Sequence, residues 1–315
     1  MKICIVGPGY MSIPPKGWVA VEILVDDYRQ TLINMGHQVD VVNTRDTSLI
    51  VWLVNSLNPD FVHIQYEEYA NLSKFINCKN VAITSHYAYL TQPHKWNPGY
   101  KDIFWNTVNS NSHIFALSEQ IAEMYIKAGV SRTLVKVTPN GVRTDKYTFN
   151  EECTRPNESI CLAKIETRKR QQVIQDIEGI KFVGNNSNLD FKMKDESYLG
   201  EWQKHDLYKN LTQFSNLVLL SDGEAHPLVC MEALSAGLGL VISEFSTANL
   251  DLNLPFIDVI PECKILDIRF IEDKIIKNRE ISIKLRSQIR EYSKTLDWQN
   301  VINSYYINAV RDIVI

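Results

Sequence analysis

The sequence has no long apolar run and no strong excess of charge of either sign. No stretch approaches the ~20 apolar residues that a membrane-spanning helix needs. The 33 lysines and arginines against 37 aspartates and glutamates leave a formal net charge of −4, which argues against a general nucleic-acid-binding surface or a polybasic membrane anchor. We therefore expect a soluble protein without general nucleic-acid binding. Peripheral membrane contact stays open, because the substrate can itself lie at a membrane.

Cysteine is scarce and is not arranged for metal or disulfide chemistry. None of the six cysteines forms a CxxC pair, none lies near a histidine at the spacing of zinc ligands, and several lie inside apolar runs. We interpret them as reduced core residues of a cytoplasmic protein. The N-terminus agrees, because one lysine followed by five apolar or small residues is too short for the core of a secretory signal.

At 315 residues, the chain is long enough for two domains of about 150 residues each. Short apolar runs alternate with helical stripes, as in doubly wound α/β sheets. A polar stretch at 145–159 interrupts this alternation and predicts a join near residue 150. The runs that we interpret as strands lie at 2–7, 39–43, 61–65, 81–85, 113–117 and 134–138, and then at 160–164, 180–184, 197–199, 216–220 and 238–243.

The last residues form an amphipathic stripe, in which apolar side chains recur every three or four positions from Trp298 to Ile313. The pattern predicts a helix and leaves two placements open, one on its own domain and one on the first domain. We predict the second placement for residues 296–315.

Ligands of doubly wound sheets bind beyond the carboxyl ends of the strands, so two such domains predict a site between them. Gly7-Pro8-Gly9 is similar to the start of a dinucleotide fingerprint, but Pro14 and Pro15 place a stiff loop before the next helix. An NAD site needs its phosphate directly at that helix end. We instead expect the loop to carry Gly17 close to a phosphate, which a backbone without Cβ allows.

The segment from Ser221 to Gly237 carries the strongest signal. Pro227 suits a first helical position, and the N–H groups of Leu228 and Val229 then suit a phosphate at the helix N-terminus. Glu224, on the loop, can accept hydrogen bonds from sugar hydroxyls. Glu232, about a turn and a half into the helix, can reach a ribose diol. Spacing alone leaves open a capping acid and an ordinary surface glutamate.

The two glutamates are separated by seven residues in the context SDGEAHPLVCMEALSAGLGLVIS. This context resembles the E-x7-E segment of glycosyltransferase family 4, whose members are retaining enzymes with the GT-B fold of two Rossmann-like domains around a nucleotide-sugar cleft. It departs from the usual family sequence at 225–227, where Gly, Phe or Pro, and Gly are more frequent. The resemblance implies an acceptor-side domain at 1–150, a nucleotide-sugar-binding domain at 151–295 and a crossover helix at 296–315.

Other segments agree with the family in the same order. LAKIETRKR at 162–170 is similar to V-G-R-x4-K-G, so Lys164 and Lys169 stand where the family contacts the donor diphosphate. Two cations opposite a helix N-terminus can neutralise that group, although a solvated basic turn is the plainer alternative. His86 stands where the family places a histidine against the donor sugar. The loop beside the nucleobase is matched by Gly200, Glu201 and Trp202.

The resemblance implies a retaining hexosyltransferase that moves a sugar from a nucleoside diphosphate, with UDP favoured by family frequency, to an acceptor hydroxyl. Lys169, Glu224 and His86 are the expected catalytic residues, and no side chain need act as a nucleophile. We expect no metal and no cofactor besides the donor, because Lys164, Lys169 and the helix at Leu228 can take the diphosphate charge. The donor sugar and the acceptor do not follow from the sequence.

Three other functions stay open. A two-lobed solute-binding protein would not explain why cations and Glu224 gather at predicted strand ends. A non-hydrolysing sugar-nucleotide epimerase shares the GT-B fold but needs no E-x7-E segment. An inactive GT-B subunit or sugar-nucleotide-binding protein is compatible with the altered residues at 225–227.

Overall fold

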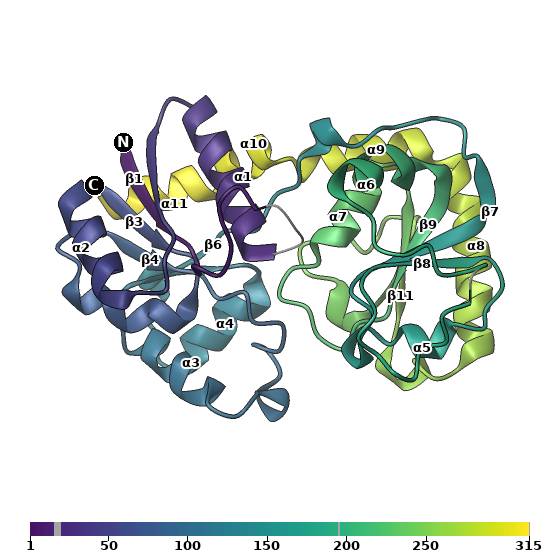
Figure 1. Cartoon of the computed structure of the whole chain (residues 1–315), viewed down its shortest axis with the longest axis horizontal. Coiled ribbons are helices and arrows are strands. Elements are labelled where there is room, and N and C mark those ends of the chain that lie inside the picture. Colours follow the sequence, from purple (N-terminus) through teal and green to yellow (C-terminus); the bar gives the residue numbers. More distant parts are fainter. Residues whose placement is uncertain (16–19, 195, 315) are drawn as a thin grey trace. The chain divides into compact units, whose positions relative to one another are not determined.

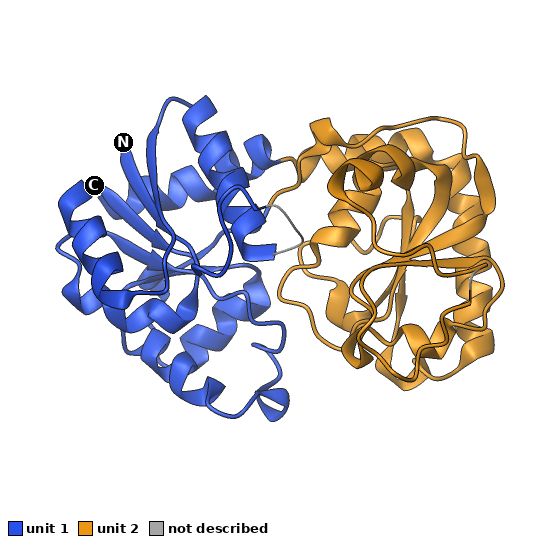
Figure 2. Cartoon of the chain, viewed as in Figure 1, with its two compact units in different colours: residues 1–140, 298–315 blue, residues 141–297 orange. Residues whose placement is uncertain are grey.

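The computed structural model describes residues 1–15, 20–194 and 196–314 (Figure 1). They form two compact units, Met1–Asn140 with Trp298–Ile315 and Gly141–Asp297 (Figure 2). Residues 141–150, which the sequence analysis assigned to the first domain, belong to the second unit. Their backbone explains why, since the N–H of Val142 donates to the carbonyl of Leu296 at 2.9 Å and that of Thr148 to the carbonyl of Tyr208 at 2.8 Å.

A six-stranded parallel sheet in the order β2-β1-β3-β4-β5-β6 forms the centre of the first unit. Its strands coincide with the six apolar runs predicted for the first half of the chain. Apolar residues without alternation suit strands covered on both faces, and Ile3, Cys4 and Ile5 are fully buried. The strands are β1 (Lys2–Val6), β2 (Gln38–Val42), β3 (Phe61–Ile64), β4 (Val81–Ile83), β5 (His113–Ala116) and β6 (Val135–Val137).

Local sequence explains where several helices of this unit begin and end. The hydroxyl of Ser118 accepts from the N–H of Ile121, and Asp46 accepts from that of Leu49, so each caps a helix start. Gly36, with φ of +85°, ends the first helix. The helices are α1 (Ala20–Asn34), α2 (Thr47–Leu57), α3 (Tyr100–Val108), α4 (Glu119–Lys127), α10 (Trp298–Val301) and α11 (Ile307–Val314), with a 3₁₀ helix at Glu67–Phe75.

The C-terminal residues complete an aromatic cluster in the first unit. The rings of Trp298 and Tyr306 lie 4.6 and 5.1 Å from that of Tyr28 in α1, and Tyr306 lies 5.4 Å from His63 in β3. A π-helical turn at Ile302–Tyr306 separates α10 from α11. The apolar stripe that begins at Trp298 therefore packs against α1 and the first sheet.

The second unit is built on a five-stranded parallel sheet in the order β11-β10-β9-β7-β8. Two details differ from the sequence-based expectation. β7 begins at Arg155, so the end of the polar stretch enters the sheet, and 197–199 is no strand, because Tyr198 forms only an isolated bridge to Phe182. The strands are β7 (Arg155–Leu162), β8 (Ile180–Val183), β9 (Phe214–Leu219), β10 (Gly239–Ser243) and β11 (Ile257–Ile260).

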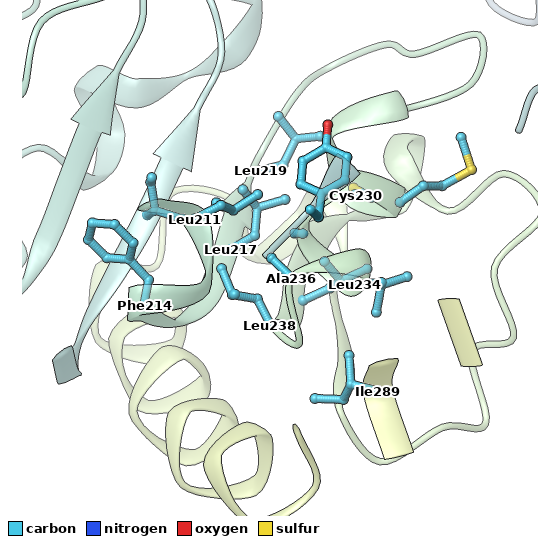
Figure 3. Packing of buried hydrophobic residues seen from close by; sticks show 14 of the residues in the cluster. Leu211, Phe214, Leu217, Leu219, Cys230, Leu234, Ala236, Leu238 and Ile289 are labelled. Carbon is cyan, nitrogen blue, oxygen red and sulfur yellow. The ribbon is translucent and has the colours of Figure 1, made fainter. Parts of the chain in front are cut away.

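Helices cover both faces of this second sheet. Leu217 and Leu219 of β9 join one buried cluster with Leu234 of α7, part of which is drawn in Figure 3, whereas Val218 joins another cluster with Ile271 of α8. Because helices cover both faces of the sheet, a ligand can reach it only at the loops that follow the strand ends. The helices are α5 (Gln171–Ile174), α6 (Lys204–Asn210), α7 (Leu228–Ser235), α8 (Ile268–Lys284) and α9 (Arg286–Thr295).

Candidate active site

The strand order of the second unit reverses between β7 and β9. From the β8 edge, the sheet runs β8, β7, β9, β10, β11, so the first strand in the chain, β7, lies between the second and the third. Open α/β sheets bind ligands beyond the carboxyl ends of the strands at such a point. The loop after β7 carries Lys164–Arg170 and the loop after β9 carries Ser221–Pro227. The N–H of Asp222 donates to the carbonyl of Arg168 at 2.9 Å and joins these two loops.

Glu224, on the loop after β9, pairs with two cations of the loop after β7. Its Oε1 forms an ion pair with Nζ of Lys169 and lies 3.4 Å from Nη1 of Arg168. The side chains of Glu224 and Lys169 are 12% and 11% exposed, so this pair is screened less by water than a surface pair. The structure thus brings together two of the predicted catalytic residues.

Arg168 is a site residue that the sequence analysis missed. Its guanidinium donates to the carbonyl of Gly223 at 2.6 Å and lies 3.4 Å from the hydroxyl of Ser221. Nε and Nη2 bind Oε1 of Glu166 at 3.1 and 2.9 Å. Arg168 therefore holds the loop of Glu224 against the loop after β7. Three cations follow one another at 168–170, and no periodicity in the sequence shows which of them turns toward the second loop.

The neighbouring cations lie in other surroundings. The side chain of Lys164 is 58% exposed, and its Nζ lies 3.9 Å from Oε2 of Glu166. Arg170 has a left-handed backbone (φ +57°) and binds both carboxylate oxygens of Glu262, at 2.8 and 2.6 Å. Of the two predicted diphosphate ligands, Lys169 is paired with Glu224 and Lys164 is not. The contact of either with a diphosphate stays a prediction.

Helix α7 begins at Leu228, one residue later than the sequence analysis placed it. Pro227 is the residue before the helix, and its carbonyl accepts from the N–H of Cys230 at 3.1 Å. The first N–H groups of a helix have no carbonyl partner within it. The amides of Leu228 and Val229 therefore form the electropositive end of α7, on the chain segment that directly follows Glu224.

Glu232 lies inside α7, and its carboxyl group is bound by a residue far away in the sequence, Tyr147. Burial raises the pKa of its carboxyl group, while a hydrogen bond from Tyr147 and the charge of Lys204 favour the ionised form. Tyr147 is itself buried, and its ring packs edge-on against that of Tyr208 at 5.0 Å. The environment gives Glu232 a fixed acceptor group, and its contact with a ribose diol stays a prediction.

The predicted nucleobase loop is fixed to the end of β8. The carbonyl of Gly200 accepts from the N–H of the residue after β8 at 2.9 Å, and Glu201 accepts from Nδ2 of Asn185 at 3.4 Å. The ring of Trp202 lies 6.2 Å from that of Phe214 and packs on the buried cluster of Figure 3. The indole is thus partly engaged by the protein, and a contact between this loop and a base stays a prediction.

In the first unit, His86 lies at the carboxyl edge of the sheet. It follows β4, and its Nε2 lies 2.8 Å from Oε1 of Gln65, which follows β3. Burial lowers the pKa of His86 to about 4, so the ring is neutral at pH 7. A contact of His86 with a donor sugar stays a prediction, and the predicted phosphate contact at Gly17 lies outside the described residues.

Among residues 1–15, 20–194 and 196–314, no three or more His, Cys, Asp or Glu side chains gather as potential metal ligands. Within the same part of the chain, every helix is too short or too polar to cross a membrane.

A scan against family models matches residues 45–146 to Glycosyltransferase Family 4. No curated protein matches the chain in a search of such proteins.

Solved structures resemble the chain over nearly its whole length. HepE of Anabaena, in complex with UDP and glucose, has a TM-score of 0.72 and 14% identity over 96% of this chain and 98% of its own. Sucrose-phosphate synthase of Thermosynechococcus elongatus has a TM-score of 0.74 and 12% identity over 96% and 97%. The lipopolysaccharide outer core galactosyltransferase WaaB, in its apo form, has a TM-score of 0.70 and 16% identity over 99% of both chains.

These findings confirm the predicted fold class, since two parallel α/β sheets occur here and GT-B glycosyltransferases are among the similar structures. The chain therefore has the GT-B fold, and its residues 45–146 resemble glycosyltransferase family 4.

Proposed function

We propose that the chain is a retaining hexosyltransferase that moves a sugar from a UDP-sugar to an acceptor hydroxyl. One observation carries this proposal: Glu224 lies between Lys169 and Arg168 at the switch point of the second sheet, directly before the electropositive end of α7. The similar HepE structures are complexes with UDP and glucose and with UDP-glucose, which supports UDP as the donor nucleotide.

The arrangement suits the charges that form when a glycosidic phosphate bond breaks. Negative charge grows on the leaving diphosphate, and Lys169 with the amides of Leu228 and Val229 can stabilise it. A bound donor would share the cation that now pairs with Glu224. The carboxylate of Glu224 then becomes free to accept hydrogen bonds from sugar hydroxyls, which orients the ring.

We propose that the diphosphate charge is carried by the protein without a metal. Lys169, Arg168 and the helix end supply positive potential at one place. The resemblance to glycosyltransferase family 4 implies that the incoming hydroxyl attacks from the face of the leaving group and that the diphosphate itself takes the proton. Glu232 would bind the ribose diol, and Lys164 would add positive charge near the diphosphate.

A ligand screen followed by a product assay tests the proposal. UDP and UDP-sugars should raise the melting temperature more than GDP, ADP and their sugars, since a ligand of the native state stabilises it by mass action. Release of UDP from the stabilising donor should require an acceptor, and NMR of the product should show the anomeric configuration of the donor.

Each other outcome points to another function. Binding of a UDP-sugar without transfer to any acceptor would favour an inactive subunit. Conversion of the free UDP-sugar to an epimer would favour an epimerase. Activity that EDTA abolishes and Mn²⁺ restores would overturn the metal-free arrangement. Glu232→Ala is the matched control, because it should weaken the thermal shift by UDP-sugars without unfolding the protein.

A further inference from the structure

A chain of buried side chains links two histidines at the carboxyl edge of the first sheet. Nε2 of His86 lies 2.8 Å from Oε1 of Gln65, and Nε2 of Gln65 lies 3.2 Å from Nδ1 of His63. Nε2 of His63 lies 2.8 Å from the hydroxyl of Thr84. Gln65 and His63 are fully buried, and Thr84 is 2% exposed. Water is therefore not available to replace a missing partner at His63, Gln65 or Thr84.

The amide of Gln65 orders the protons along the chain. Its oxygen can only accept, so His86 carries a proton on Nε2. Its nitrogen donates to Nδ1 of His63, which places the proton of that ring on Nε2, toward Thr84. Burial keeps both rings neutral, with the pKa of His63 lowered to about 3 and that of His86 to about 4. Each neutral ring then has one N–H and one lone pair.

The main chain of His86 is held separately from its ring. The backbone N–H of His86 donates to the carboxylate of Glu67, which also accepts from the hydroxyls of Ser85 at 2.9 Å and Tyr100 at 3.2 Å. Glu67 is buried. With the backbone fixed there, the bond to Gln65 decides how the imidazole is turned and which nitrogen carries the proton.

The other ring nitrogen of His86, Nδ1, is available to a bound ligand. Within the described residues, Nδ1 of His86 has no hydrogen-bond partner, and its side chain is only partly buried. We propose that Gln65 is a positioning residue that holds His86 as the Nε2–H tautomer and so presents the Nδ1 lone pair to a hydroxyl of the substrate. His86 would thus accept a hydrogen bond from the sugar and not donate one. The substrate part of this inference rests on the proposed function.

The tautomer is tested on the full-length protein without any ligand. Histidines labelled with ¹⁵N give imidazole shifts that separate Nε2–H, Nδ1–H and charged rings, and the signals of His86 are assigned with His86→Gln. We expect the Nε2–H tautomer at pH 7. The Nδ1–H tautomer would overturn the proposal, because it requires the amide of Gln65 to be turned the other way.

Two variants test whether Gln65 sets this state. Gln65→Leu should move the signals of His86 toward a mixture of tautomers, while Gln65→Glu, which keeps an acceptor oxygen, should retain the proton on Nε2. Thr84→Ser is the matched control: it keeps the hydroxyl that pairs with His63 at the far end of the chain and should leave the tautomer of His86 as it is. An unchanged His86 spectrum in folded Gln65→Leu would overturn the positioning role.

Kinetics test the substrate part. With the donor found in the screen, Gln65→Leu should lower kcat/KM about tenfold, the effect of one neutral hydrogen bond, and Gln65→Glu should recover part of it. Unchanged kcat/KM in Gln65→Leu would overturn the link to substrate. If the wild-type chain shows no transfer, the proposed function fails, but the spectra still decide whether Gln65 sets the tautomer.

Discussion

Replacing Lys169 by alanine is the sharpest test of the candidate site, because the structure separates Lys169 from its neighbour Lys164. Lys169 is 11% exposed and paired with Glu224, whereas Lys164 is 58% exposed and lies 3.9 Å from Glu166. Both cations take diphosphate positions by resemblance. The geometry predicts that only the buried one contributes strongly to the rate.

The size of the effect follows from the charge that develops in the reaction. A unit charge about 4 Å from a cation interacts by about 4 kcal/mol at the effective dielectric of a protein surface site. Loss of one donor to a developing oxyanion typically lowers kcat by about 10²–10³, or about 2.7–4 kcal/mol. We expect a loss of this size for Lys169→Ala. For Lys164→Ala we expect less than about tenfold, because exposed charge pairs contribute about 0–1 kcal/mol.

Steady-state release of UDP from the preferred UDP-sugar measures these effects. Lys169→Ala should lower kcat more than it raises KM, because the cation matters most when the diphosphate leaves. Lys169→Arg should recover part of the rate, since it restores the charge in another shape. Arg168 lies 3.4 Å from Glu224 and binds the carbonyl of Gly223, so these contacts should keep the two loops folded in the alanine variant. Circular dichroism and thermal melting check this.

Two results would refute the reasoning. A folded Lys169→Ala protein with kcat within about threefold of wild type would show that this cation does not face the leaving group. A loss at Lys164→Ala as large as that expected for Lys169 would show that the exposed cation is the one recruited by the donor.

Three further perturbations have defined outcomes. Glu232→Ala should raise the KM for the donor by about 10- to 100-fold and change kcat little, since it removes a charged hydrogen bond made in ground and transition state alike; a large kcat effect measured at saturating donor would contradict the ribose role. The pKa of His86 is about 4 in the folded protein and about 6.5 in an unfolded chain. The neutral ring therefore contributes fully to the free energy of unfolding above about pH 6.5, and this contribution is lost as the pH falls toward about 4. Urea unfolding of His86→Gln should therefore show a free energy of unfolding that depends less steeply on pH, by about 1.4 kcal/mol per pH unit in this window. An equal slope would contradict the lowered pKa of His86. Gly184→Ala should destabilise the protein by about 2 kcal/mol more than Gly36→Ala in thermal melts, because both have positive φ but a Cβ at Gly184 would lie 2.0 Å from a backbone oxygen, whereas the position at Gly36 is open; equal losses would show that the backbone at Gly184 yields freely.

Much of the fold is already contained in short stretches of sequence. Buried parallel strands need apolar residues on both faces. A run such as KICIV can therefore be recognised as a strand without knowledge of the strands beside it. The start of α4 is equally local, because Ser118 caps its own helix. Helix α2 was not predicted, since TSLIVWLVNSL carries no charge and contains a continuous apolar run at 49–54, which periodicity alone does not distinguish from a strand.

The candidate site is only partly local. Glu224 and Glu232 stand on one continuous loop and helix, so their spacing could be interpreted directly, and Lys169 followed from the resemblance. The partners of these groups could not be predicted in the same way. Tyr147 reaches Glu232 across 85 residues of sequence, and Arg168 reaches Gly223 across 55.

Those partnerships are decided by strand order and loop path, which no single segment encodes. Arg168, Lys169 and Arg170 have nearly the same chemistry, yet the left-handed turn at Arg170 sends one to Glu262 while the other two turn to Glu224. In the sequence, Gln65 is only a single polar residue at the end of a predicted strand. Only the pairing of β3 with β4 places it beside His86 and makes it the group that sets the proton of that ring.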